Sequence, residues 1–180
     1  SQLSNVIKKV ARCLAPELAR KDVPRRKDPA GHSEADAIAD LLGKTQRKGY
    51  VPLLFGPGWS VRAFGGSYSL RDWELLARHG GIFGVRLEEK ISNPYAVSFP
   101  WPDFGVPAVE DFEHAMYQVM IQARFHRNLY VGCMGGIGRT GTFLACLHKT
   151  AVQMHSGASV GNSMDHVAHI RSCYLGHAIE

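Results

Sequence analysis

The sequence predicts an α/β fold in which helices cover both faces of a sheet. From residue 50 onward, short apolar runs typical of strands alternate with segments whose apolar residues recur at helical spacing. One such run, NLYVGC, passes directly into a glycine-rich loop and a further helical segment. At 180 residues and 45% hydrophobic composition, the chain is long enough to bury one real core. Strands that alternate with helices in a single domain are typical of a sheet with helical layers.

Residues 1–49 are predicted to form a helical N-terminal extension with a basic linker. Apolar side chains recur at helical spacing from Leu3 to Leu18, which predicts one amphipathic helix or two short ones. Residues 20–32 combine prolines with basic side chains and are typical of an exposed connection. A capping box that begins at Ser33 predicts the start of another helix.

Residues 50–180 are predicted to form the main domain. Its elements are bounded by glycines, prolines and capping residues. Strands are expected at VPLLF (51–55), VRAF (61–64), IFGVRL (82–87), YAVSF (95–99) and NLYVGC (128–133), and helices at 69–80, at 108–126 and directly after the glycine-rich loop.

Composition bears on the partners, the redox environment and the membrane association expected of the protein. The net charge of +5 mildly favours anionic partners, although 21% charged residues is ordinary. Four separated cysteines without a C-x-x-C pair fit neither a zinc site nor a disulfide framework, so we expect a reducing, cytoplasmic location. No apolar stretch approaches the roughly 18 residues of a membrane span, and no signal-peptide pattern is present.

The glycine-rich loop resembles two nucleotide-binding motifs, and both fail at their defining chemistry. Gly136, Gly138 and Gly141 spell G-x-G-x-x-G, but the dinucleotide fingerprint needs a following strand that ends in an acidic residue. A nucleotide-binding P-loop needs a glycine where Cys133 stands and a lysine where Arg139 stands. A different anion chemistry is therefore expected.

The spacing C-x5-R, from Cys133 to Arg139, predicts a cradle for a phosphate beside a nucleophile. Successive backbone N–H groups and the N-terminus of the following helix can bind an anion. A cysteine in such surroundings ionises more readily than a free thiol, and arginine can bind two phosphate oxygens at once. Thr140 can donate its hydroxyl to the sulfur when the sulfur leaves. The uncharged residues of the cradle are Met134, Gly135, Gly136, Ile137 and Gly138.

The remaining cysteines and histidines have simpler interpretations. Cys146 falls on the apolar face of the helix after the loop and is expected in the core. Cys173 is expected in the core or on the surface, with a redox partnership to Cys133 as the less favoured alternative. No metal-ligand pattern is present, and no cofactor is expected. Solvated helix faces are the expected place for His148, His155, His166, His169 and His177.

The sequence resembles the protein tyrosine phosphatase superfamily in two separate motifs. GCMGGIGRTG is similar to the family signature H-C-x-x-G-x-G-R-[ST]-G, and WPDFGVP, residues 101–107, is similar to the family's mobile acid loop. The similarity covers about residues 50–180. It implies a central sheet of four or five mostly parallel strands flanked by helices, and hydrolysis of phosphate monoesters without a metal.

The resemblance also implies a role for each motif residue. Cys133 would attack phosphorus and become a phosphocysteine, while Asp103 would act first as acid and then as base. Trp101 and Pro102 would let the acid loop close over the ligand. Arg139 and the N–H groups of the loop from Met134 to Arg139 would bind the phosphoryl oxygens.

Three departures from the family pattern qualify this inference. Gly132 stands where the family usually has histidine, which implies weaker activation of the thiol. The stretch HIRSCYLGHAIE resembles the one that precedes a water-positioning glutamine, and this sequence ends at Glu180. The long substrate-recognition loop of tyrosine-specific members has no clear counterpart, as in compact dual-specificity members.

The substrate expected from these features is a phosphotyrosine protein, with phosphoserine and phosphothreonine as further substrates. An uncharged loop disfavours inositol phosphates. A phosphatase of RNA 5′ ends or small phosphorylated metabolites is the alternative within the enzyme class, so nucleic acid is the less favoured partner. A catalytically weakened phosphate-binding module is the alternative outside it. We expect a monomer.

Overall fold

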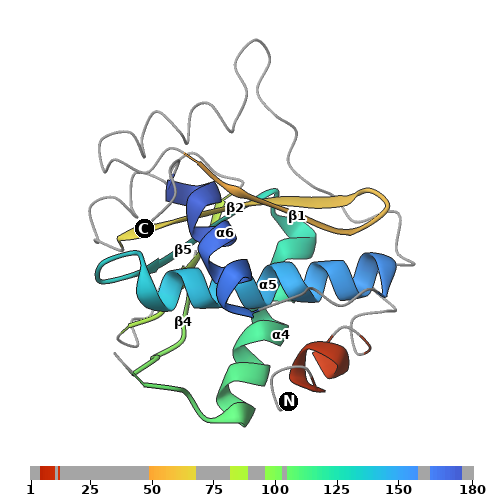
Figure 1. The fold of residues 1–180 in the computed structure, drawn as a ribbon. Helices are drawn as coiled ribbons and strands as arrows, with labels where there is room; N and C mark the ends of the chain where they lie inside the picture. The colour runs from red at the N-terminus through yellow and green to blue at the C-terminus, as the bar shows by residue number, and fades with distance from the viewer. Residues whose placement is uncertain are drawn as a thin grey trace.

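The computed structural model describes residues 5–10, 12, 49–67, 82–88, 96–102, 105–157 and 163–175. It contains a five-stranded sheet with strand order β1-β2-β5-β3-β4 (Figure 1). The β1–β2 pair is antiparallel and the other three pairs are parallel, which confirms the α/β prediction. The strands are β1 (Val51–Gly56), β2 (Trp59–Ser67), β3 (Ile82–Arg86), β4 (Ala96–Ser98) and β5 (Asn128–Cys133), and the helices are residues 5–10, α4 (Val109–Phe125), α5 (Gly138–Ser156) and α6 (Ser163–Leu175).

Strand β5 lies at the centre of the sheet, and all six of its residues are buried. An apolar strand between two parallel neighbours has no solvated face, which explains its composition. Ser67 at the end of β2 pairs with Cys133, and Arg86 at the end of β3 pairs with Gly132. The carboxyl ends of three strands therefore meet beside Cys133, where ligands bind in open α/β sheets.

Strand β2 is longer than the predicted segment 61–64. It begins at Trp59, whose fully buried indole donates a hydrogen bond to the carbonyl oxygen of Ala123 in α4 at 3.1 Å. It continues through Gly65 and Gly66, two poor strand formers that pair with β5. Local propensity does not predict this extension, because the two glycines are held in an extended conformation by pairing with the central strand.

The helices share one core with the sheet. Phe112 of α4 is buried and meets Phe143 of α5 edge-on with ring centroids 6.2 Å apart. The other buried apolar residues of α4 are Ala115, Met116, Val119, Met120 and Ala123. These two helices therefore lie on the same face of the sheet, with α6 beside α5 (Figure 1). Cys146 is buried as predicted, and burial raises the pKa of its thiol to about 12. Among the described helices, none combines the length and apolar composition needed to cross a membrane.

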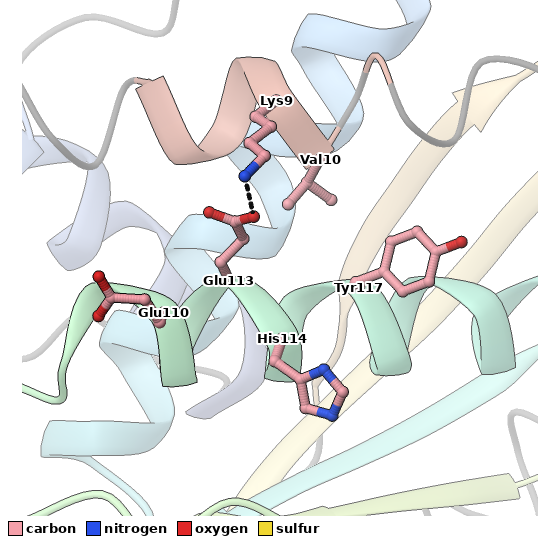
Figure 2. Close-up of a pocket in the computed structure, with 6 residues that line it drawn as sticks. All are labelled: Lys9, Val10, Glu110, Glu113, His114 and Tyr117. Carbon is pink, nitrogen blue, oxygen red and sulfur yellow. Dashed lines mark ion pairs between the residues drawn. The ribbon is translucent and has the colours of Figure 1, made fainter.

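Part of the predicted N-terminal extension packs on this core. Val6 and Val10 of the helical residues 5–10 are 5% and 2% exposed and belong to the main apolar cluster. Figure 2 shows Lys9 pointing at Glu113 of α4, with the ammonium nitrogen 2.6 Å from a carboxylate oxygen. A pocket of about 250 Å³ lies between this helix and α4. The domain boundary predicted at residue 49 stays a prediction.

One prediction about the histidines is wrong. His166 of α6 is only 7% exposed, and its Nε2 atom lies 3.2 Å from Nδ1 of His148 in α5. The two rings pack with centroids 4.9 Å apart, so they form a contact between helices and not a solvated face. The helical spacing of α6 did not reveal which of its sides would meet α5. The predicted start of a helix at Ser33 and the predicted helix at 69–80, together with Cys13 and His177, lie outside the described residues.

Candidate active site

Cys133 ends β5 with its side chain buried at 3% exposure. The hydroxyl of Thr140, itself fully buried in the first turn of α5, donates a hydrogen bond to the Cys133 sulfur at 3.1 Å. The start of α5 at Gly138 adds the positive end of the helix dipole beside the sulfur. The structure therefore places the Cys133 thiol beside a hydroxyl donor and the N-terminus of a helix.

The segment 133–139, called the phosphate loop here, turns sharply at Gly136. This residue has φ +73°, and a Cβ atom there would lie 2.2 Å from the Gly66 carbonyl carbon and 2.4 Å from the Ser67 nitrogen. Only glycine fits, because the neighbouring atoms are backbone and cannot move aside. At Gly135 and Gly138, by contrast, an added Cβ atom would have no atom within 4 Å. Packing and backbone conformation therefore require glycine at position 136, whereas neither requires it at positions 135 and 138.

Arg139 joins the phosphate loop to the segment that carries the acid loop. Its Nη1 atom donates hydrogen bonds to the carbonyl oxygens of Leu87 at 3.3 Å and Trp101 at 3.1 Å. Leu87 follows β3 and its own N–H donates to the Gly132 carbonyl oxygen at 2.9 Å. The guanidinium is therefore held in place by backbone carbonyls from two other segments.

The acid loop is folded tightly against the core at Trp101. The indole N–H donates to the Gly105 carbonyl oxygen at 2.9 Å, and the Gly105 N–H donates to the Pro102 carbonyl oxygen at 3.1 Å. The Trp101 ring packs edge-on against Phe112, with centroids 6.0 Å apart. These contacts join Gly105 to Trp101 and Pro102. The predicted acid, Asp103, lies outside the described residues.

Several residues that support the loop escaped the sequence analysis. The Ser67 hydroxyl donates to the Met134 carbonyl oxygen at 2.8 Å, and the Tyr130 hydroxyl donates to the Ser67 carbonyl oxygen at 2.5 Å. Arg171 and Tyr174 of α6 donate to the other side of the loop. Arg171 and Tyr174 are three residues apart and so lie on one face of α6. This spacing was the only feature of the sequence that could have suggested a shared contact.

Two apolar side chains of the phosphate loop are exposed. Met134 is 73% exposed and Ile137 is 41% exposed. The five uncharged residues predicted for the loop thus divide into two exposed apolar side chains and three glycines. Among the described residues, no group of three or more His, Cys, Asp or Glu side chains is arranged to hold a metal ion.

Comparison with known proteins places these features in a family. The sequence model of the family described as Protein-tyrosine phosphatase matches residues 87–176, half of the chain. An uncharacterized protein of Methanocaldococcus jannaschii is 31% identical over 148 residues, which cover 77% of this chain and 89% of the relative. A receptor-type tyrosine-protein phosphatase eta of Gallus gallus is 41% identical over 49 residues, which cover 25% of this chain and 4% of that receptor.

The family match includes β5, the phosphate loop, α5 and all of α6. It therefore covers the elements that bring Cys133, Arg139 and Thr140 together. The resemblance inferred from the two motifs is confirmed by this match and by the similarity to a tyrosine-protein phosphatase. The chain belongs to the protein-tyrosine phosphatase family.

Proposed function

We propose that this protein hydrolyses phosphate monoesters through a phosphocysteine intermediate, and that its substrates are phosphotyrosine proteins. The observation that carries the proposal is the 3.1 Å hydrogen bond from Thr140 to the Cys133 sulfur, in the same loop as Arg139. A nucleophile, a donor to it and a permanent cation within eight residues form the constellation that phosphoryl transfer to sulfur requires.

In the first step the thiolate of Cys133 attacks phosphorus, and an S–P bond forms as the ester P–O bond breaks. The loop N–H groups and the Arg139 guanidinium bind the three equatorial oxygens, where charge accumulates in the transition state. Asp103 gives its proton to the departing oxygen. The dephosphorylated hydroxyl then leaves, and the enzyme holds a phosphocysteine and an ionised Asp103.

In the second step water attacks the phosphocysteine. Asp103 takes one proton from the water, the S–P bond breaks, and inorganic phosphate and the Cys133 thiolate result. The Thr140 hydroxyl, 3.1 Å from the sulfur, stabilises the charge that returns to the leaving thiolate. The side chains named here balance every proton and electron pair, so the proposed cycle involves no metal or cofactor.

Phosphotyrosine fits the mouth of the site better than a highly charged ligand does. The exposed side chains of the loop, Met134 and Ile137, are apolar and can pack against an aromatic leaving group. An inositol phosphate or an RNA end would leave its further charges beside these apolar groups. Phosphoserine and phosphothreonine peptides are the further substrates proposed. A thiolate nucleophile works only while reduced, so we propose a reducing location.

The test of this proposal is turnover of p-nitrophenyl phosphate by wild type and Cys133→Ser, each with and without excess chelator. We expect wild-type turnover to survive the chelator and the variant to fall to background, because serine is not ionised at neutral pH. The matched control is Cys146→Ser, which removes a thiol outside the loop. Activity that survives in Cys133→Ser, or that the chelator abolishes, would contradict the mechanism.

A panel of phosphopeptides, RNA 5′-phosphates and small phosphorylated metabolites then separates the substrate classes. We expect the highest kcat/KM for a phosphotyrosine peptide. Preference for RNA ends or metabolites would replace the proposed substrate while leaving the mechanism in place. Tight binding of orthovanadate without any turnover would favour a phosphate-binding module, the alternative that Gly132 suggests.

A further inference from the structure

Two side chains of α6 hold the outer side of the phosphate loop. The fully buried Tyr174 hydroxyl lies 2.9 Å from the Gly136 carbonyl oxygen and 3.3 Å from that of Ile137. Arg171 donates from Nε to the Ile137 carbonyl oxygen at 3.0 Å and from Nη2 to that of Gly138 at 3.2 Å. Three successive carbonyls of the loop thus accept hydrogen bonds from one helix.

Two glycines outside the sharp turn make room for these side chains. A Cβ atom at Gly65 of β2 would lie 2.8 Å from the Tyr174 ring, and one at Gly141 of α5 would lie 2.5 Å from Nε of Arg171. Both distances are far below van der Waals contact. The close approach of α6 to the loop is therefore accommodated at separate places in β2 and α5.

The peptide unit explains what such contacts can do for a bound phosphate. Each peptide bond is planar and trans, so the C=O of one residue and the N–H of the next point in opposite directions. Carbonyls held towards α6 at Gly136, Ile137 and Gly138 turn the following N–H groups away from α6. Those N–H groups belong to residues 137–139, which the proposed function assigns to phosphate binding.

We propose that Tyr174 and Arg171 are positioning residues of the phosphate site. They hold three loop carbonyls outward and thereby aim the N–H groups of residues 137–139 at the phosphoryl oxygens. On the opposite side of the loop, the bond from Ser67 to the Met134 carbonyl oxygen acts on the N–H of Gly135 in the same way. This inference rests on the proposed function, because it assigns a role at the same site.

Other contacts already dock α6 on the domain, so the Tyr174 hydroxyl is not needed for that purpose. Ile170 and Leu175 are 1% and 3% exposed in the common core, and His166 packs on His148 of α5. Removing only the hydroxyl should leave the helix in place. The loop should then sample orientations in which fewer N–H groups face the ligand, at a cost in transition-state binding.

The first test is Tyr174→Phe, measured by orthovanadate affinity, kcat and KM for p-nitrophenyl phosphate, and thermal unfolding. We expect a roughly 3- to 10-fold loss in vanadate affinity and in kcat/KM, the range of one lost hydrogen bond. Tyr117→Phe on the exposed side of α4 is the matched control and should match wild type. Val119→Ala, a core change in α4, controls for lost stability and should lower Tm without lowering vanadate affinity.

The second test is Arg171→Ala with and without added guanidinium ion. We expect the variant to lose vanadate affinity and turnover, and guanidinium to restore part of both, since the ion can occupy the same carbonyls. Arg171→Lys keeps the charge but not the two-atom fork, so it should recover less than full affinity. A purely structural role would give a lower Tm with no rescue by guanidinium.

The outcomes separate this inference from the proposed function. If wild type turns over substrate and Tyr174→Phe and Arg171→Ala bind vanadate as tightly as wild type, the positioning role is refuted while the phosphatase mechanism stands. If wild type neither binds vanadate nor turns over substrate, the proposed function fails and the positioning role fails with it. Weaker vanadate binding in both variants at unchanged Tm supports the inference.

Discussion

Gly135 and Gly136 are neighbours in the phosphate loop, yet a side chain has room at position 135 and none at position 136. Gly136 has positive φ and lies against the backbone of Gly66 and Ser67, whereas a Cβ atom at Gly135 would meet open space. Every residue other than glycine is strained at position 136, both by its φ angle and by the clash. Position 135 tolerates alanine.

We therefore expect Gly136→Ala to lower the free energy of unfolding by about 2 kcal/mol or more and to abolish turnover. Gly135→Ala, its matched control, should stay within about 0.5 kcal/mol of wild type. Urea unfolding and p-nitrophenyl phosphate turnover measure both effects. Equal stability of the two variants would show that the loop can rearrange around the added methyl group.

Asp103 is the residue proposed to act as general acid and then as general base. We expect Asp103→Asn to lower kcat by the roughly 10²–10⁴-fold typical of lost general acid catalysis, with vanadate affinity largely kept. The loss should be larger for an alkyl phosphate than for p-nitrophenyl phosphate, because a poor leaving group needs the proton more. Asp111→Asn in the first turn of α4 is the control. An equal loss for both substrates would argue against the acid.

At the scale of helices, α5 and α6 meet through a pair of histidines whose pKa values the fold lowers. Burial, the nearby His148 and the positive charge of Lys149 lower the pKa of His166 to about 4. Burial and then His169 lower the pKa of His148. Both shifts have the same sign: protons bind more weakly in the folded protein than in the unfolded chain.

Stability linked to these histidines is therefore complete above the unfolded pKa of about 6.5 and is lost as pH falls towards 4. We expect the Tm of wild type to drop more steeply over this range than that of His166→Gln, which cannot take up the proton. His155→Gln, at an exposed position of α5, should keep the wild-type slope. Parallel Tm curves for wild type and His166→Gln would contradict the linkage.

At the scale of the whole molecule, the N-terminal helical residues are attached to α4 by apolar packing more than by charge. Val10 is 2% exposed, whereas the Lys9 side chain in the ion pair with Glu113 is 54% exposed (Figure 2). An exposed ion pair contributes about 0–1 kcal/mol, since water and salt screen it. Burial of a valine side chain contributes about 1.5–3 kcal/mol.

We therefore expect Val10→Ala to lower the free energy of unfolding by about 2 kcal/mol and Lys9→Ala by less than about 1 kcal/mol. Guanidinium chloride unfolding of both variants gives the comparison. A larger loss for Lys9→Ala would mean that the ion pair, and not the core contact, attaches this helix to the domain.

The sequence by itself determined the parts of the protein that are encoded over a few consecutive residues. The strand, the loop and the helix around Cys133 follow from an apolar run, a group of glycines and a helical pattern within residues 128–156. The spacing of Cys133, Thr140 and Arg139 was readable for the same reason. The acid loop motif was equally local, and it indicated the family together with the first motif.

Only the tertiary structure decided which distant side chains support that loop. Ser67 reaches the Met134 carbonyl across 67 positions and Tyr174 reaches the Gly136 carbonyl across 38, while His166 finds His148 in another helix. A serine, a tyrosine or a histidine has no local pattern that states its partner, because the partner is set by how helices and strands pack. The proposed nucleophile, Cys133, could be predicted from its neighbours in the chain, whereas the side chains that contact its loop could be found only from the packing in space.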